Sequence, residues 1–217
     1  MFVELCAGLA SVSLMLQGGR YARPPVSRMG SKTGYALALL RVMGLRPGQG
    51  AEHYLWCEPD PGCRALLHAY TDREVMQEAA AIIRSWKDEE PRALWERLRA
   101  EGPIRAGDAR EVARELTVGH LSYRSMEPAS GFNPGMARDT ASPCWRPSLS
   151  AVADSTDRQP LPAAVTPDAR LIDPADIQPG TVVFMDPPYV GTTGYGSDLP
   201  RAAAVALARR WADAGAR

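Results

Sequence analysis

Short apolar runs alternate with amphipathic segments along this chain of 217 residues. The runs at 1–8, 53–60 and 180–189 each end on Gly, Pro or acidic residues, which is typical of buried strands that enter turns. Apolar residues at helical spacing predict helices over 9–17 and 33–45, a pair of helices in 72–101 with Pro91 opening the second, and a closing helix over 199–216. Strands that alternate with helices predict an α/β fold with a parallel, doubly wound sheet.

Residues 102–165 interrupt this alternation with a segment rich in Pro, Ser, Gly, Asp and Arg. A long irregular segment inside a compact domain is typically functional or partly disordered. We therefore divide one core domain into three parts: residues 1–101, an irregular insertion over 102–165, and residues 166–217, which hold the clearest strand.

Composition excludes few classes of protein. The chain has 25 basic residues (Lys and Arg) and 25 acidic residues (Asp and Glu), so its formal net charge is +0. A neutral chain has no overall electrostatic attraction to a polyanion such as DNA. Any nucleic-acid contact must come from local arginines. The cysteines form no CxxC pair and no His cluster accompanies them, so we expect no metal site and a reducing cytoplasm. No signal peptide or membrane span is visible.

The stretch FMDPPYVGTTGY, residues 184–195, ends the clearest strand on an acid, two prolines and an aromatic residue. Ligands of open parallel sheets bind beyond the carboxyl ends of the strands, where we expect Asp186. Pro187 and Pro188 lack an amide N–H, so they end the strand and leave the Pro187 carbonyl as an acceptor. With Tyr189 as a stacking face, these two acceptors suit a planar NH2 group on an aromatic ring.

DPPY at 186–189 resembles the catalytic motif of amino-methyltransferases, above all the DNA adenine-N6 methyltransferases, and FVELCAG at 2–8 resembles their cofactor motif. The resemblance extends loosely over most of the chain. It implies a Rossmann-like fold, S-adenosylmethionine as methyl donor, and double-stranded DNA whose adenine is flipped out of the helix. The implied catalytic residues, which accept from the amino group or stack on the base, are Asp186, Pro187, Pro188 and Tyr189.

The resemblance also places the cofactor at the carboxyl end of the first strand. Leu5, Cys6, Ala7 and Gly8 form the turn at which the backbone approaches the methionine part of the cofactor. Glu4 is assigned to the cofactor's ammonium, and capping of the following helix is the alternative.

Two further acidic residues are candidates for contacts with the cofactor. Glu58 ends the second strand, where an acid commonly holds ribose hydroxyls, and Asp60 competes for this role. Asp168 lies upstream of the DPPY strand, where the family often places an acid that contacts the cofactor's adenine. A solvated loop acid is the alternative for Asp168.

Lysine is rare in this chain, which has Lys32 and Lys87 beside many arginines. The segment RMGSK resembles the family's Gly-Gly-Lys motif beside the cofactor, which assigns Gly30 and Lys32 to the cofactor site. A compact ammonium suits a tight polar pocket better than a guanidinium fork does. An ordinary surface lysine is the alternative. In the family this motif usually precedes the cofactor strand, whereas here it follows that strand and its helix.

The family places target recognition in the irregular segment, so 102–165 is the candidate recognition region. Arg124 and Arg146 from this segment, with Tyr195 after the DPPY motif, are assigned to DNA contacts. A polar surface insertion is the alternative for this segment.

Other activities compete with adenine methylation. Cytosine-N4 methylation needs the same amine chemistry and is the nearest alternative, whereas the surroundings of Cys144 do not match a cytosine-C5 enzyme. The family fold expects further strands after the DPPY helix, so we expect a C-terminally truncated enzyme with an incomplete sheet. A non-catalytic remnant that binds cofactor or DNA without turnover is therefore the second alternative. The resemblance implies a bacterial or phage-encoded protein, either restriction-linked or solitary.

Overall fold

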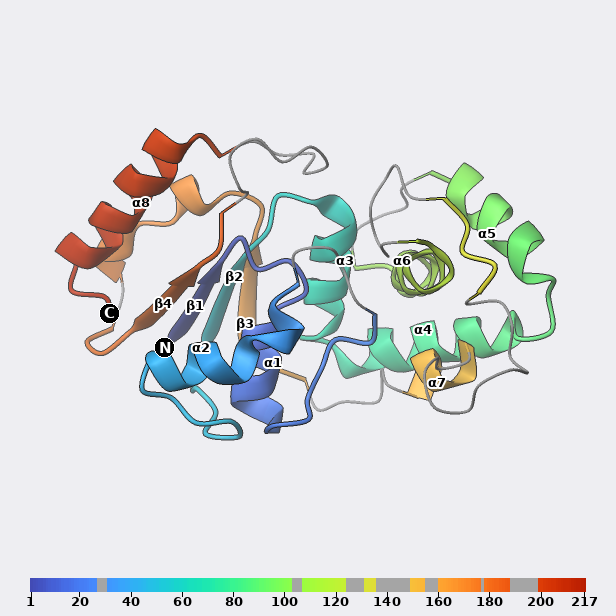
Figure 1. Ribbon diagram of the computed structural model, residues 1–217, viewed down its shortest axis with the longest axis horizontal. Coiled ribbons are helices and arrows are strands. Elements are labelled where there is room, and N and C mark those ends of the chain that lie inside the picture. The colour runs from blue at the N-terminus through green and yellow to red at the C-terminus, as the bar shows by residue number, and fades with distance from the viewer. Residues whose placement is uncertain are drawn as a thin grey trace.

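The computed structural model describes residues 1–26, 31–102, 107–123, 131–135, 149–154, 160–176, 178–187 and 199–217. Its centre is a parallel sheet in the order β3-β2-β1-β4 (Figure 1). The strands of this sheet are β1 (Phe2–Leu5), β2 (Tyr54–Cys57), β3 (Ala163–Thr166) and β4 (Val182–Met185).

The chain starts in the middle of this sheet. From β1 it crosses to β2 and then β3 on one side, and it returns to β4 on the other side, where Phe2 lies opposite both Tyr54 and Val182. The connections therefore reverse direction between β1 and β4, which is the switch point of a doubly wound sheet. The predicted α/β fold with a parallel sheet is confirmed, and the sheet is compatible with a Rossmann-like fold.

Alternate residues of each strand face opposite sides of the sheet, and each side has its own apolar cluster. On one face Phe2, Tyr54 and Trp56 are buried together with residues of three helices, which are α1 (Ser11–Gly18), α2 (Ala36–Val42) and α3 (Pro61–Ala69). On the other face Val3 and Leu5 are buried with residues of α8 (Arg201–Asp213) (Figure 1). Both faces of the sheet are thus covered, as a parallel sheet requires.

A helical lobe lies beside α3, on the side away from β4 (Figure 1). It consists of α4 (Arg73–Ser85), α5 (Pro91–Ala100), α6 (Ala109–Leu121) and α7 (Leu149–Asp154). The helix pair predicted in 72–101 is confirmed, and Pro91 is the first residue of α5. The lobe is inserted between α3 and β3, so it interrupts the second crossover of the sheet.

Helix α6 corrects the prediction that residues 102–165 lack regular structure. The Asp108 side chain caps this helix by accepting a hydrogen bond from the Arg110 amide at 2.8 Å. Val112 and Leu116 on its apolar side are fully buried. An amphipathic helix was hidden because Pro- and Gly-rich flanks dominated the composition of the whole window. Strand β3 also begins inside this window, at Ala163.

The remaining regular elements are short 3-10 helices, η1 (Lys32–Gly34), η2 (Ala169–Leu171) and η3 (Pro174–Asp176). After α8 the backbone returns to the sheet, where the Val183 amide donates to the Arg217 carbonyl at 2.8 Å and the Arg217 amide donates to the Thr181 carbonyl at 3.0 Å. This pattern is that of a parallel bridge along β4. Within the described ranges, no helix has the length and apolar character needed to cross a membrane.

Candidate active site at the carboxyl ends of the strands

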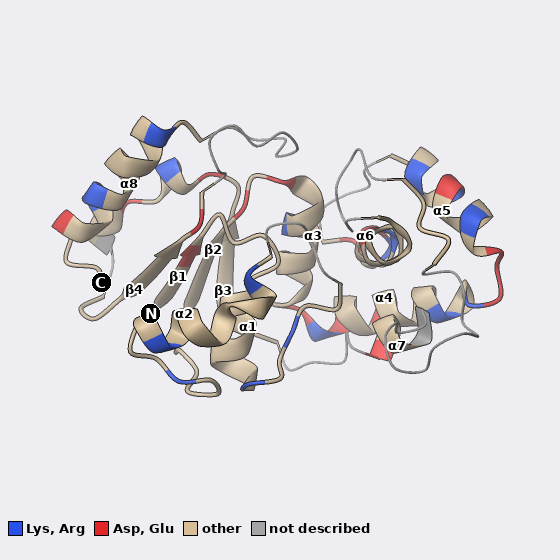
Figure 2. Ribbon diagram, viewed as in Figure 1, with Lys and Arg blue, Asp and Glu red and all other residues tan. Residues whose placement is uncertain are grey.

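Three strand ends meet at the switch point of the sheet. The Asp186 amide, just after β4, donates to the Leu5 carbonyl at the end of β1, with 3.3 Å between the atoms. The Ala7 amide in turn donates to the Cys57 carbonyl at the end of β2, at 2.8 Å. Figure 2 shows acidic segments where these strands end. The DPPY strand and the cofactor-like turn, which are far apart in the sequence, therefore lie side by side.

The turn after β1 has an unusual backbone. Cys6 and Gly8 have φ values of 58° and 55°, in the left-handed region. Glycine adopts this region freely, whereas a residue with a side chain does so at a cost. No described heavy atom lies within 4 Å of the place where a Cβ on Gly8 would stand. A ligand can therefore approach the backbone closely at Gly8.

Glu58 at the end of β2 links this turn to the next one. Its Oε2 accepts a hydrogen bond from the Gly8 amide at 2.7 Å, and its Oε1 accepts one from the Asp60 amide at 2.9 Å. Asp60 faces away from the turn, because its side chain caps α3 by accepting from the Cys63 amide at 2.8 Å. Of the two competing acids, Glu58 is thus the one placed beside the cofactor-like turn.

Lys32 reaches the same site from the segment between α1 and α2. Its Nζ forms an ion pair with Asp186 Oδ2, and the two side chains are 18% and 21% exposed. Lys32 came from the predicted cofactor motif and Asp186 from the predicted catalytic motif. The structure brings them into direct contact, so the alternative of an ordinary surface lysine is not supported.

Glu4 lies deeper, on the side of the sheet that carries α1. Its Oε2 accepts hydrogen bonds from the amide of Ser13 at 3.0 Å and from the hydroxyl of Ser13 at 2.6 Å. The Ser13 hydroxyl accepts from Trp56 Nε1 at 2.9 Å. Because an amide in the first turn of α1 lacks an intrahelical partner, Glu4 caps this helix from the neighbouring strand. This finding supports the capping alternative, while contact with a cofactor ammonium stays a prediction.

The environment of Glu4 changes its ionisation. The side chain is only 2% exposed. Burial raises its pKa to about 7, the hydrogen bonds from Ser13 oppose this rise, and the negative charge of Asp186 adds to it. Glu4 is therefore about half protonated at neutral pH.

Cys6 lies between the carboxylates of the site. Burial, followed by the negative charges of Glu58 and Asp186, raises the pKa of its thiol to about 12. A thiol with such a pKa is a poor nucleophile. Cys6 is therefore a neutral thiol at neutral pH.

Leu5 and Asp168 contribute to the site less directly than predicted. The Leu5 side chain is fully buried against α8, so this residue offers only its backbone. Asp168 follows β3 and caps η2, and its carboxylate pairs with Arg170 at 2.7 Å. This hydrogen bonding with Arg170 lowers the pKa of Asp168. Contact of Asp168 with the cofactor's adenine stays a prediction.

Several predicted site residues cannot be placed. They lie outside the described residues and are Gly30, Arg124, Arg146, Pro188, Tyr189 and Tyr195. Conversely, Ser13 and Trp56 take part in the hydrogen bonds around Glu4 although sequence reasoning did not single them out. The signal in the sequence was a serine within a helix that is otherwise mostly apolar.

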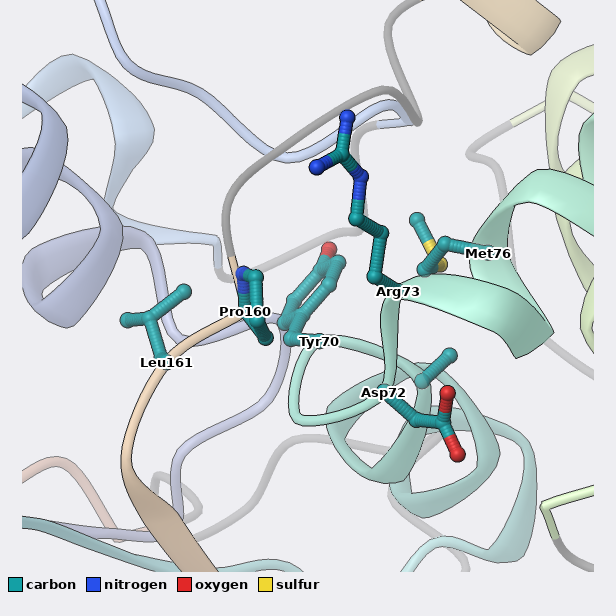
Figure 3. A pocket seen from close by; sticks show the side chains of 7 residues that line it. Tyr70, Asp72, Arg73, Met76, Pro160 and Leu161 are labelled. Atoms are coloured by element: carbon teal, nitrogen blue, oxygen red, sulfur yellow. The ribbon is translucent and has the colours of Figure 1, made fainter.

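A separate pocket lies between the α3–α4 corner and the segment that enters β3 (Figure 3). Its lining residues are Ala69, Tyr70, Asp72, Arg73, Met76, Pro160 and Leu161. Asp72 already caps α4, since its Oδ1 accepts from the Glu74 amide at 2.9 Å. In Figure 3 the Arg73 side chain extends away from Asp72. The lining is mostly apolar and contains none of the predicted site residues.

Comparison with known proteins assigns no family to the chain. No protein-family model matches it, and a search of curated proteins finds no significant match. The chemistry of the site therefore has to be derived from the residues of the chain itself.

Proposed function

We propose that this chain forms the core of an S-adenosylmethionine-dependent methyltransferase that acts on the N6 amino group of adenine in DNA. The proposal depends on one juxtaposition above all. Asp186 and Pro187 follow β4 directly beside the left-handed turn at Cys6 and Gly8, at the switch point of the sheet. Methyl transfer needs an acceptor amine and a donor next to each other, and these two features supply one site for each.

The residues at the turn fit the proposed cofactor. Open space in front of Gly8 allows close approach to the backbone, and the Glu58 carboxylate beside this turn is a type of acceptor suited to ribose hydroxyls. The carboxylate of Glu58 favours a positive charge nearby, and S-adenosylmethionine carries one on its sulfonium group. When bound, this cofactor supplies an activated methyl group.

The acceptor side is built from Asp186 and Pro187. The Asp186 carboxylate and the Pro187 carbonyl accept the two N–H bonds of a planar amino group, which orients the nitrogen lone pair out of the ring plane. Fixed acceptors of this kind act mainly by positioning and by electrostatic preorganisation. The base must leave the double helix to reach these groups.

The helical lobe offers a surface for DNA. Arg99 stacks over Trp95 at 4.8 Å from the ring centroid, and Arg92 stacks over Phe132 at 5.5 Å. The Arg92 side chain is 65% exposed, although it lies 3.8 Å from Glu96. Arginines beside aromatic rings are suited to contacts with phosphates and bases. Such contacts belong to the proposal and are not needed for the placement of Asp186.

Transfer of labelled methyl groups from S-adenosylmethionine to unmethylated genomic DNA tests the proposed function. We expect label in N6-methyladenine after digestion to nucleosides, and label in N4-methylcytosine would indicate the alternative base. Asp186→Ala should lower the rate at least about 100-fold, the usual loss for a group that contacts the reacting atoms. Calorimetry should show that the variant still binds the cofactor.

Asp88→Ala is the matched control, because this aspartate is exposed and lies just before α5, far from the strand ends in sequence and fold. Its rate should equal that of the wild type. A normal rate in Asp186→Ala would refute the assigned mechanism. Absence of both binding and transfer in a folded wild-type sample would refute the proposed function.

A further inference from the structure

The two carboxylates nearest the cofactor-like turn are held in different ways. Glu58 accepts hydrogen bonds from the backbone amides of Gly8 and Asp60, which cannot leave without moving the turns. Asp186 instead pairs with the side chain of Lys32. A side chain of four methylene groups can swing aside while the backbone stays in place. Asp186 is therefore the acid whose partner can be exchanged.

The backbone that carries Lys32 is firmly anchored. Three hydroxyl groups bond to one another here: Ser11 to Ser31 at 2.9 Å, Ser11 to Thr33 at 3.0 Å, and Ser31 to Thr33 at 2.7 Å. Ser11 begins α1, Ser31 caps η1, and Thr33 follows Lys32 within η1. These hydrogen bonds hold η1 against the start of α1. The Lys32 backbone is therefore fixed, and only its side chain needs to move to leave Asp186.

An ammonium group donates to a carboxylate much as a planar amino group does. Lys32 therefore fills the place on Asp186 that the amino group of the base would take. We propose that Lys32 is a specificity-determining residue: it neutralises Asp186 in the resting site, screens this charge from the cationic methyl donor, and is displaced by the amino group of the base. The inference rests on the proposed function and adds a role for a residue assigned only to cofactor contact.

The geometry of methyl transfer determines how strongly the Asp186 charge changes the affinity for the methyl donor. The methyl group must lie between the sulfonium and a nitrogen that is bonded to Asp186, so the sulfonium comes within about 8 Å of the carboxylate. Over such a distance, with an effective dielectric between that of protein surface and water, one unshielded charge changes affinity about three- to tenfold. The neutral product S-adenosylhomocysteine does not experience this attraction. The ratio of the two affinities therefore isolates the charge effect from all contacts that both ligands share.

Calorimetric titration of the whole chain with both ligands tests the inference. Lys32→Met should raise the preference for S-adenosylmethionine over S-adenosylhomocysteine about three- to tenfold relative to wild type, because Asp186 loses its counter-charge. Lys32→Arg retains the charge and should keep the wild-type ratio. Lys87→Met removes the other lysine, which is exposed, and should change neither affinity. In an Asp186→Asn background no carboxylate holds the Lys32 ammonium beside the site, so Lys32→Met should raise the preference less than it does in the wild-type background.

Two results would overturn the role of Lys32 while leaving the proposed function intact. The first is an unchanged ratio in Lys32→Met. The second is a fall in the ratio, which would show that Lys32 favours the cationic ligand instead of screening Asp186 from it. If the wild type binds neither ligand, the proposed function fails as well.

A second measurement needs no cofactor. Reductive methylation followed by mass spectrometry reports the reactivity of Lys32 and Lys87 separately. Lys32 should react more slowly than Lys87 in the wild type, and Asp186→Asn should accelerate Lys32 alone. If Asp186→Asn leaves the rate at Lys32 unchanged, the ion pair does not persist in solution and the inference is wrong.

Discussion

Replacing Glu4 by glutamine should make the chain more stable at high pH and should abolish part of its pH dependence. Glu4 is buried on the α1 side of the sheet and accepts hydrogen bonds from Ser13. Glutamine has nearly the same shape and keeps an oxygen that can accept from the Ser13 amide. It cannot ionise, so the variant removes the charge and little else.

The magnitude follows from the pKa of Glu4, which burial raises from 4.5 to about 7. The folded chain then binds this proton more tightly than the unfolded chain does. Consequently the free energy of unfolding falls as the pH rises from about 4.5 to about 7, and the loss is complete above that range. Each pKa unit corresponds to about 1.4 kcal/mol, so the ionised carboxylate costs about 3 kcal/mol at pH 8. Between pH 5 and pH 8, Glu4→Gln should gain about 2 to 3 kcal/mol relative to wild type.

Urea unfolding at several pH values between 5 and 8.5, followed by tryptophan fluorescence, measures this difference. Glu78→Gln serves as the control because Glu78 is exposed on α4, and its curve should run parallel to that of the wild type. The reasoning would be refuted if the curves for Glu4→Gln and wild type ran parallel over this range. A wild type that became steadily more stable from pH 5 to pH 8 relative to Glu4→Gln would contradict even the sign.

Two further predictions concern the same region. Ser13→Ala should lower the free energy of unfolding by about 1 to 3 kcal/mol, because Trp56 Nε1 and Glu4 are buried and both lose a partner. Thermal unfolding measures this loss, and a shift no larger than that of Ser85→Ala, on the exposed end of α4, would contradict it. Cys6, whose pKa is about 12 against an ordinary 9.0, should react with iodoacetamide at pH 8 about 1000-fold more slowly than a free thiol. Labelling of Cys6 at the rate of a small thiol would show that its environment is misassigned.

Much of the fold could be predicted from local pattern. Strands β1, β2 and β4 are short apolar runs that stop at Gly, Pro or acidic residues, and turn chemistry of this kind is readable without tertiary contacts. Strand β3 was not predicted, because it begins inside the segment that was expected to be irregular. Helix α6 was missed because its flanks have a composition typical of loops, although Asp108 and the apolar spacing after it mark a capped helix. The helix predicted over 33–45 is shorter, since its first residues form η1 and α2 begins at Ala36.

Only the part of the candidate site that lies at the carboxyl ends of the strands could be predicted from the sequence. Because parallel strands end on one edge, Asp186 and the turn at Gly8 had to lie close together. The contact of Lys32 with Asp186 depends on the path of the segment between α1 and α2, which no periodicity describes. The direction of Glu4 depends on which face of β1 the helix α1 covers. Hydrogen bonds between side chains and distant amides, such as that of Glu58 to Gly8, are likewise set by the assembled fold.

The pair of hydrogen bonds made by Glu58 also determines which parts of the site can move. The turn after β1 and the turn after β2 belong to separate crossovers, and a single carboxylate ties their amides together. Neither turn can act as a hinge without breaking a partly buried, charge-assisted hydrogen bond. This side of the site is rigid and already has its final geometry before a ligand binds. Adjustment during a binding cycle then falls to side chains on the opposite side, where Lys32 meets Asp186.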